Sequence, residues 1–465
     1  MLFETILLIL HRLIAIGDFL WGLPMLIFLA IVAVMYTVGT RGFQFTYFVH
    51  CLKNTFGKQF QGQAGVSSGR GISSFQAMCM ALCSTLGVGN IVGVSLAIAL
   101  GGPGAVLWIW IAGLLGMIIK YGEITLGVKF RETDPETGMY RGGLMWYVEK
   151  GLGRRWRWLA VVYAAVNIVA IINAPAVQIN TIASAVTAYF NIPSLAVGLL
   201  IAGLMGLVLF GGLKRISRFA EKIVPIMSTS YLIVTSVILI LYLPEIPRAL
   251  GLIFKYAVTD AQAVAGGFGG ASVAMAVRHG LARGFYSSGA GSGDAPFAHS
   301  SSDVDHPVKQ GLWGVSEVVV DNIMCTCTAL IILVTGAWES GATGAALFIQ
   351  AISTAFNSPA FGNIFVIVLI VFFAFTTAVM CAYYGEICLR YFTKSKVAAN
   401  VYRGVICLAA VFATNSLFVS RVDLLWRVGD FNVAVSIMLS LASLVLLRKE
   451  VFASTKEYKQ MINKP

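Results

Sequence analysis

The sequence predicts an all-α polytopic membrane protein, and three observations lead to this prediction. First, the 465-residue chain is 58% hydrophobic and only 12% charged, which is about half the charged fraction of a soluble protein. Second, its apolar stretches repeatedly reach the roughly 20 residues that a helix needs to cross a bilayer. Third, its basic residues fall in the short segments between those stretches. The net charge of +12 therefore indicates membrane topology and not a nucleic-acid partner.

We expect an interfacial amphipathic helix over residues 1–18, followed by eleven membrane spans. The spans are expected at 19–39, 74–100, 103–128, two within 158–213 that divide near residue 192, 223–243, 261–280, 311–336, 361–387, 398–419 and 429–447. A basic loop is expected at 214–222 and a polar loop at 282–310. With the N-terminus outside and the C-terminus in the cytoplasm, only Arg12, Arg248, Lys255, Arg421 and Arg427 of the 33 Lys and Arg residues lie outside, as the positive-inside rule requires.

Setting the first span aside leaves ten spans, which divide into two sets of five with opposite orientation. We predict residues 1–40 as the interfacial helix and an extra span, 41–70 as a cytoplasmic loop, 71–260 and 261–447 as inverted repeats, and 448–465 as a cytoplasmic tail. Each repeat begins with a span that contains clustered glycines, at 87–89 in the first and at 266–270 in the second. In transporters such a pair of interruptions points to a binding site near the middle of the membrane.

The most informative stretch is Gly87, Val88, Gly89 and Asn90, in the middle of the second span. No Asp, Glu, Lys or Arg occurs between Arg70 and Lys120. Irregular backbone at such depth is tolerated only where it is buried in protein or lines a watery cavity. The amides that follow the interruption suit a carboxylate, and the carbonyls before it, from Cys83 to Leu86, suit Na⁺. Helix packing through Gly89 and Gly93 is the alternative.

Four further polar side chains lie at membrane depth, and each has two interpretations. Gln178 and Asn180 are amides in one span, and they either join helices or face a ligand. Thr376 and Thr377 supply two adjacent hydroxyls, although a threonine in a helix commonly bonds to a carbonyl of its own helix. Spacing alone does not choose between these roles.

Four acidic residues lie within or near the predicted spans, namely Glu123, Glu317, Asp321 and Glu386. We expect Glu123 and Glu386, near cytoplasmic ends, to pair with Arg or Lys, whereas Asp321 is the candidate for proton coupling. His279, His299 and His306 lack the spacing of a metal site and are expected in loops. The sequence shows no nucleophile–base pair and no phosphate-binding loop, so it indicates neither an enzyme nor an ATP-driven transporter.

Four long strings resemble one known family. They are LGVGNIVGVSLAIALGGPGAVLWIW at 86–110, PAVQINTIA at 175–183, GGFGGASVAMAVRHGLARGFYS at 266–287 and FAFTTAVMCAYYGE at 373–386. They resemble the alanine or glycine:cation symporters, also called the sodium:alanine symporter family, and the resemblance extends over residues 40–445. It implies a leucine-transporter-like fold of five-plus-five inverted repeats with an extra N-terminal helix. It also implies Na⁺-coupled uptake of small neutral amino acids, alanine or glycine by default, across the inner membrane.

Carried over position by position, the resemblance also implies a substrate site and an ion site. The substrate carboxylate would meet the backbone of residues 87–90, and the polar end of the amino acid would contact Gln178 and Thr377. The glycine-rich segment of the seventh span, Gly266, Gly267, Phe268 and Gly269, would line the other side. Na⁺ would lie between carbonyls near Cys83 and Leu86 and the hydroxyls of Thr376 and Thr377. No organic cofactor is implied.

Two departures from the family pattern bear on this site. The string SSGAG at 287–291 stands where the family usually has Ser-Asn-Glu-Ala-Gly, so the contact of that acid is absent. Cys381 stands where the family commonly has Trp, which leaves more room and allows a larger neutral substrate such as glutamine or serine. The alternatives to sodium symport are a proton-coupled carrier of the same fold that uses Asp321 or Glu123, and a non-transporting amino-acid sensor.

Overall fold

The computed structural model describes residues 12, 16–17, 19–20, 22–57, 69–261, 270–415 and 422–463, without the side chains of 169–172 and 422–428. The described part is mainly helical, and its one sheet is an antiparallel hairpin of β1 (Glu132–Thr133) and β2 (Tyr140–Arg141). The expected interfacial helix at 1–18 falls almost wholly outside these residues.

The helices before the middle of the chain are α2 (Leu23–Gly39), α3 (Phe43–Thr46), α4 (Phe48–Leu52), the π-turn η1 (Lys53–Gly57), α6 (Ser74–Thr85), the 3₁₀ turn η2 (Val88–Asn90), α7 (Val92–Gly101), α8 (Ala105–Lys129), α9 (Leu144–Leu152), η3 (Arg154–Trp156), α10 (Arg157–Phe190) and α11 (Ser194–Leu209). Those that follow are α12 (Gly212–Leu241), η4 (Leu243–Glu245), α13 (Ile246–Tyr256), α14 (Val273–Ser288), α15 (Ala295–His299), α16 (Pro307–Val334), η5 (Ala337–Ser340), α17 (Gly344–Ala355), α18 (Pro359–Phe392), α19 (Lys396–Phe412) and α21 (Val422–Ile462).

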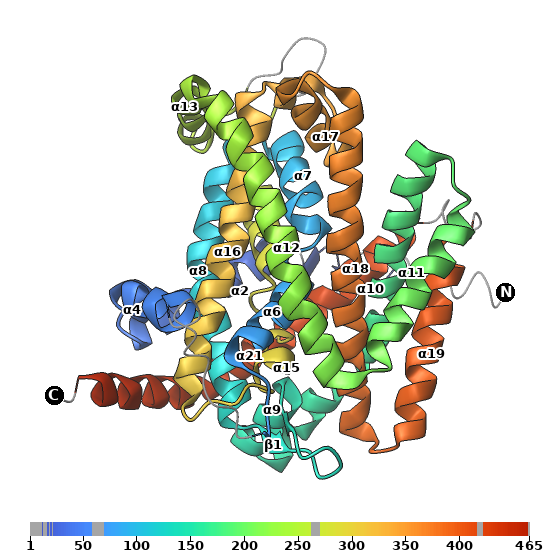
Figure 1. Ribbon diagram of the computed structural model, residues 1–465. Coiled ribbons are helices and arrows are strands. Elements are labelled where there is room, and N and C mark those ends of the chain that lie inside the picture. The colour runs from blue at the N-terminus through green and yellow to red at the C-terminus, as the bar shows by residue number, and fades with distance from the viewer. Residues whose placement is uncertain are drawn as a thin grey trace.

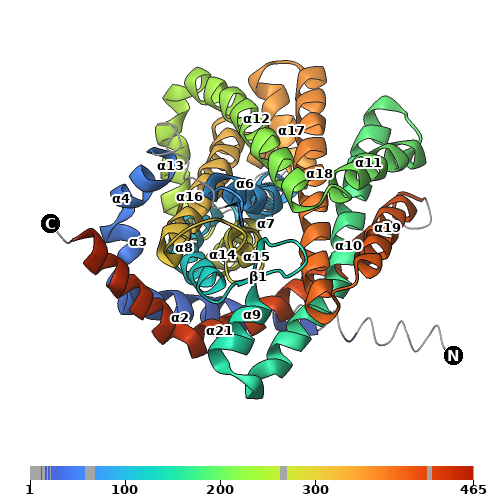
Figure 2. The same ribbon diagram turned by 60° about the horizontal axis from the view of Figure 1, so that its bottom comes forward.

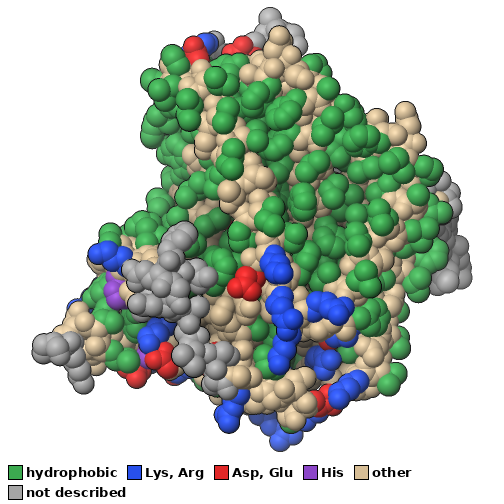
Figure 3. Space-filling model, viewed as in Figure 1, with side chains coloured by type: hydrophobic (Ala, Val, Ile, Leu, Met, Phe, Trp, Pro, Cys, Tyr) green, Lys and Arg blue, Asp and Glu red, His purple; other side chains and the backbone are tan. Residues whose placement is uncertain are grey.

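Six of the described helices are long and apolar enough to cross a membrane, namely α8, α10, α12, α16, α18 and α21 from residue 429 onward. Together α6 and α7 form a seventh candidate, bent by 62° at its break. Figure 3 shows hydrophobic side chains over most of one face, with Lys and Arg gathered towards the bottom. The chain is therefore a multi-pass membrane protein, while the predicted total of eleven spans stays a prediction.

Several boundaries differ from the sequence prediction. The basic segment 214–222, expected to be a loop, forms the first turns of α12, and the expected tail continues α21 to Ile462. The polar segment 282–310, also expected to be a loop, contains the end of α14, all of α15 and the start of α16. Charge and polarity marked these stretches as loops, yet a helix tolerates both where it leaves the apolar layer or packs on polar partners.

The interrupted span α6–α7 and the interrupted helix pair α14–α15 lie at the centre of the molecule. In Figure 2, α6, α7, α14 and α15 are enclosed by α8, α10, α12, α16, α18 and α21. The half-helix α7 packs on α14, and α6 packs on α15. The pairs α6–α7 and α14–α15 therefore run in opposite directions, with α7 towards the top of Figure 1 and α15 towards its bottom.

Small residues allow the central helices to approach their neighbours closely. A Cβ on Gly280 of α14 would lie 2.3 Å from the Ala105 carbonyl oxygen of α8. One turn later, a Cβ on Gly284 would lie 2.6 Å from the Cβ of Ala112. Spacing of small residues by four positions is the usual way for membrane helices to pack tightly, and here it fixes α14 against α8.

Candidate functional site

The first interruption comprises residues 86–91, between α6 and α7. The backbone N–H of Gly87 donates to Oδ1 of Asn90 at 3.1 Å, so the asparagine side chain closes the turn. A Cβ on Gly87 would lie 3.0 Å from the Thr377 hydroxyl, which explains why a glycine occupies this position. The first N–H groups of a helix have no partner inside it, so those of Val88 and Gly89 remain suited to an anionic group.

Two threonines of α18 lie beside this interruption, with different contacts. The Thr377 hydroxyl lies 3.1 Å from the Cys83 carbonyl at the end of α6, and 2.8 Å from the Phe373 carbonyl of its own helix. The Thr376 hydroxyl donates to the Phe373 carbonyl at 3.0 Å and lies 4.0 Å from the Met227 sulfur. The structure thus brings Thr377 to the end of α6, while the contacts of Thr376 are to α18 and α12. The Leu86 amide continues the helical pattern by donating to Leu82.

The second interruption comprises residues 289–294, between α14 and α15. Gly289, Gly291 and Gly293 adopt φ values of 59°, 93° and 79°, in the left-handed region that favours glycine. The predicted interruption at Gly266, Gly267, Phe268 and Gly269 lies outside the described residues. The alternating glycines of SGAGSGD were the available signal, but their polar surroundings led us to expect a loop.

A buried ion pair connects the two interruptions. Lys120 of α8 donates to the Ser288 carbonyl at 2.6 Å and to Glu317 of α16 at 2.7 Å. Glu317 also accepts from the Thr85 hydroxyl at 3.2 Å and lies 3.2 Å from Nε2 of His299. Both charged partners are fully buried. His299, which was expected in a loop, is thus part of the core.

The remaining acids of the spans have distinct partners. Glu386 pairs with Arg390 at 2.8 Å and Arg403 at 2.7 Å, which confirms its expected role. The same expectation was wrong for Glu123. Its carboxylate accepts from the amides of Gly293 at 2.8 Å and Gly291 at 3.3 Å, and from a hydroxyl of α21 at 2.7 Å. It therefore stabilises the second interruption.

Asp321 of α16 lies between the two interrupted helices. It accepts from Nδ2 of Asn90 at 2.6 Å and from the Ser287 hydroxyl at 3.0 Å. Asp321 is buried, with 2% of its surface exposed. These contacts leave it as a group that could take a proton or favour a cation nearby. Among the described residues, no group of three His, Cys, Asp or Glu has the arrangement of a metal site.

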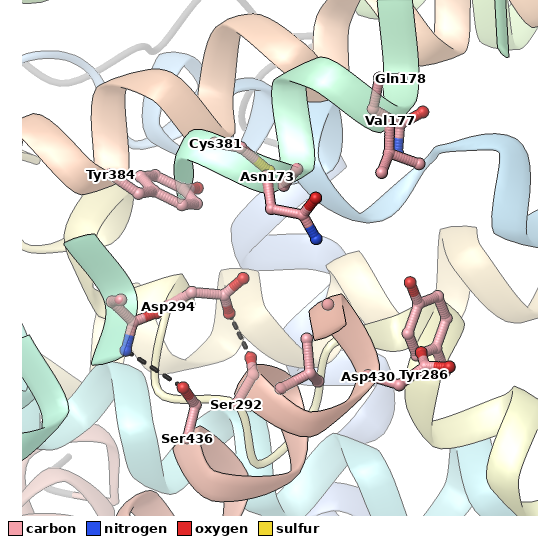
Figure 4. A pocket seen from close by; sticks show the side chains of 14 residues that line it. Asn173, Val177, Gln178, Tyr286, Ser292, Asp294, Cys381, Tyr384, Asp430 and Ser436 are labelled. Atoms are coloured by element: carbon pink, nitrogen blue, oxygen red, sulfur yellow. Dashed lines mark hydrogen bonds between the residues drawn. The ribbon is translucent and has the colours of Figure 1, made fainter. Parts of the chain in front are cut away.

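A cavity of about 150 Å³ lies beside the interruptions (Figure 4). It is lined by Asn167, Asn173, Ala174, Val177 and Gln178 of α10, Tyr286 of α14, Ser292 and Asp294 of the second interruption, Cys381 and Tyr384 of α18, and Gly429, Asp430, Val433 and Ser436 of α21. The Gln178 side-chain oxygen is buried and has no hydrogen-bond partner within the described chain. Asn180, in contrast, donates to the Ala413 carbonyl at 2.6 Å and joins helices.

Two tyrosines separate this cavity from the first interruption. The Tyr286 ring lies 3.8 Å from the position of a Cβ on Gly89, and the Tyr384 hydroxyl lies 3.4 Å from the Ser84 hydroxyl. Both tyrosines line the cavity. The structure therefore forms two clusters from the predicted residues, with Gln178 and Cys381 on the cavity and Cys83, Thr377 and residues 87–90 behind the tyrosines. Tyr286, Ser292, Asp294 and Asp430 are cavity residues that the sequence analysis missed.

Comparison with known proteins gives one consistent result. The model of the sodium:alanine symporter family matches residues 8–464. An uncharacterized transporter of Bacillus subtilis, YflA, is 37% identical over 95% of this chain and 92% of its own. The sodium/alanine symporter AgcS of Methanococcus maripaludis is 34% identical over 96% of each chain. Among solved structures, MhsT in complex with L-phenylalanine is similar in fold, with a TM-score of 0.58 and 15% identity over 84% of this chain and 93% of that one.

Proposed function

Because the chain belongs to the sodium:alanine symporter family, we propose that it carries a small neutral amino acid across the cytoplasmic membrane together with Na⁺. The protein is a transporter and not an enzyme. The observation that carries the proposal is the contact of the Thr377 hydroxyl with the Cys83 carbonyl at 3.1 Å. It brings oxygen atoms of two helices together at an interrupted span, where transporters of this kind coordinate their coupling ion.

The substrate is proposed to bind between this ion site and the cavity. The substrate carboxylate would meet the Val88 and Gly89 amides, and the polar end of the amino acid would contact Gln178. The side-chain oxygen of Gln178 has no partner in the described chain. Tyr286 lies between these two groups, so a substrate that contacts both requires this ring to turn aside. Alanine and glycine are the default substrates, and the small Cys381 side chain on the cavity leaves room for glutamine or serine.

We propose that the two interrupted spans begin two inverted repeats, over residues 71–260 and 261–447. The opposite directions of α6–α7 and α14–α15 support this arrangement. Residues 1–40 would supply an extra span, 41–70 a cytoplasmic loop and 448–465 a cytoplasmic tail. Transport would then proceed by alternating access, with Na⁺ and the amino acid favouring the same conformation by a linkage of about 1–3 kcal/mol.

The second candidate function is a proton-coupled carrier with the same fold. It is favoured by Asp321, a buried carboxylate that contacts Asn90 of the first interruption at 2.6 Å. Protonation of this group would change a contact between α16 and the interrupted helix, and could thereby couple to substrate binding.

The two candidates are separated by uptake of labelled alanine into proteoliposomes. We expect uptake under an inward Na⁺ gradient and none under a matched K⁺ gradient. Thr377→Val should reduce Na⁺-dependent uptake at least about tenfold, since it removes one oxygen ligand but keeps the side-chain shape. Thr335→Val is a matched control, because the Thr335 hydroxyl bonds within its own helix at the end of α16. Uptake that ignores Na⁺ and follows a pH gradient would contradict the sodium proposal.

A further inference from the structure

The cavity contains a carboxylate that the proposed function does not use. Asp294 lies at the end of the second interruption, directly before α15, and its side chain borders the cavity (Figure 4). Its carboxylate accepts a hydrogen bond from the Ser292 hydroxyl. Lys120, a basic residue of the same region, is already bonded to Glu317 and Ser288. Lys120 attracts the Asp294 carboxylate electrostatically, and the Ala295 amide donates to it, but no Lys, Arg or His in the described part of the chain lies within ion-pair distance of Asp294.

Carboxylates and amides line the cavity. Besides Asp294 it is lined by a second carboxylate, Asp430, and by the amides Asn173 and Gln178. None of its described lining residues is Lys, Arg or His. A carboxylate away from bulk water is costly unless donors or a cation surround it. An occupant that brings N–H groups would satisfy Asp294, whereas one that places its own carboxylate there would be repelled.

The position of Asp294 indicates which end of an amino acid it faces. Figure 4 shows Asp294 and Gln178 on opposite sides of the cavity. If Gln178 meets the polar end that carries the α-carboxylate, Asp294 faces the side chain of the substrate. Cys381 borders the same cavity, and its small side chain leaves room for a substrate longer than alanine.

We propose that Asp294 determines specificity by selecting amino acids whose side chains end in N–H donors. Two kinds of side chain share this chemistry, the amide of glutamine and asparagine and the ammonium group of a basic amino acid. The inference rests on the proposed function, because it requires an amino acid in this cavity. Since hydrogen bonds to a charged group are the stronger ones, a donor-bearing side chain should bind at least about tenfold better than a side chain of equal size without donors.

The experiment is inhibition of labelled alanine uptake in proteoliposomes by unlabelled glutamine, glutamate, methionine and lysine. Glutamate and methionine match glutamine in length but lack its terminal N–H groups. Glutamine or lysine should inhibit the wild type at concentrations at least about tenfold lower than glutamate and methionine do. The glutamine and lysine arms distinguish an amide from an ammonium substrate. Asp294→Asn, and Asp294→Ser as a second variant, should reduce this preference to within about threefold.

Asp305→Asn is the control, because Asp305 is an exposed acid outside the cavity, paired with Lys309. Its preference should equal that of the wild type. Equal inhibition of the wild type by glutamine and methionine would overturn the inference. Asp294 variants would also overturn it if they kept the preference, or if alanine uptake and inhibition by glutamine weakened equally.

Failure of the proposed function would look different. A wild type without Na⁺-dependent alanine uptake contradicts symport, and the same amino acids are then tested for their effect on the thermal unfolding midpoint of the purified protein. Stabilisation by glutamine or lysine that is lost in Asp294→Asn would support the role of Asp294 on its own. Equal stabilisation of both proteins would overturn it.

Discussion

At the scale of single residues, Lys120 connects several of the central helices. It is fully buried, and its ammonium group contacts the last carbonyl of α14 and the carboxylate of Glu317. Glu317 in turn accepts from Thr85, the last residue of α6. One ion pair therefore fixes both ends at which the helices are interrupted. A buried pair of this kind is costly to break, because each partner alone is an uncompensated charge.

Replacement of Lys120 by Met should therefore destabilise the protein by about 3–5 kcal/mol, since it leaves the Glu317 charge buried. The double variant Lys120→Met, Glu317→Gln removes both charges and should recover most of the loss. The measurement is the unfolding midpoint in detergent. Lys309→Met is the control, because the Lys309–Asp305 pair is exposed and should contribute less than about 1 kcal/mol. A single Lys120 variant as stable as the wild type would contradict this role.

At the scale of elements, the sequence predicted the interruption at 87–90 but not the one at 289–294, for a physical reason, while the interruption predicted at 266–270 falls almost wholly outside the described residues. Residues 87–90 stand in an uncharged apolar run, so the glycines there indicated either a broken membrane helix or close helix packing, and the structure shows the break. Residues 289–294 stand among Ser, Gly and Asp, which resemble a surface loop. Their amides at Gly291 and Gly293 donate to Glu123, and the Ser288 carbonyl just before them accepts from Lys120, two residues of α8 that are distant in the sequence. No local pattern can reveal such partners.

In the candidate site, too, the sequence predicted single residues but not how they are arranged. Gln178, Cys381 and Thr377 were predicted individually, and each lies in one of the two clusters. That Tyr286 separates these clusters depends on how α14 packs against the first interruption, which side-chain spacing within one span cannot indicate.

The second interruption makes a specific demand on Gly293. Its φ is 79°, and a Cβ would lie 2.8 Å from the Tyr163 hydroxyl, which donates to the Ser292 carbonyl at 2.9 Å. Gly293→Ala should therefore cost the backbone strain of about 1–2 kcal/mol and a further 1–3 kcal/mol, roughly, for the crowding. Gly153→Ala is matched, since Gly153 has a φ of 83° and nothing within 4 Å of a Cβ. Equal unfolding midpoints for the two variants would show that the crowding at Gly293 is relieved without cost.

At the scale of the whole molecule, charge and apolar length predicted a membrane protein but not the number of its spans. The six long helices and the bent pair leave α2, α11 and α17 as apolar helices of only 10–17 residues. Helices of this length cross a bilayer only where it thins or where neighbours cover their ends. The eleven-span arrangement requires α2, α11, α14 and α19 all to cross, and it fixes the side on which each connection lies.

Protease-cleavable tags at four places test this arrangement in right-side-out and inside-out vesicles. With eleven spans, a tag at the N-terminus and one between α10 and α11 should be cleaved only from the outside. A tag at the C-terminus and one between α18 and α19 should be cleaved only from the cytoplasmic side, where most Lys and Arg residues are expected. If both termini are cleaved from the same side, the number of spans is even and the eleven-span arrangement fails. If the tag between α10 and α11 is cleaved from the cytoplasmic side, the first repeat is inverted relative to the proposal, and the proposed direction of transport fails with it.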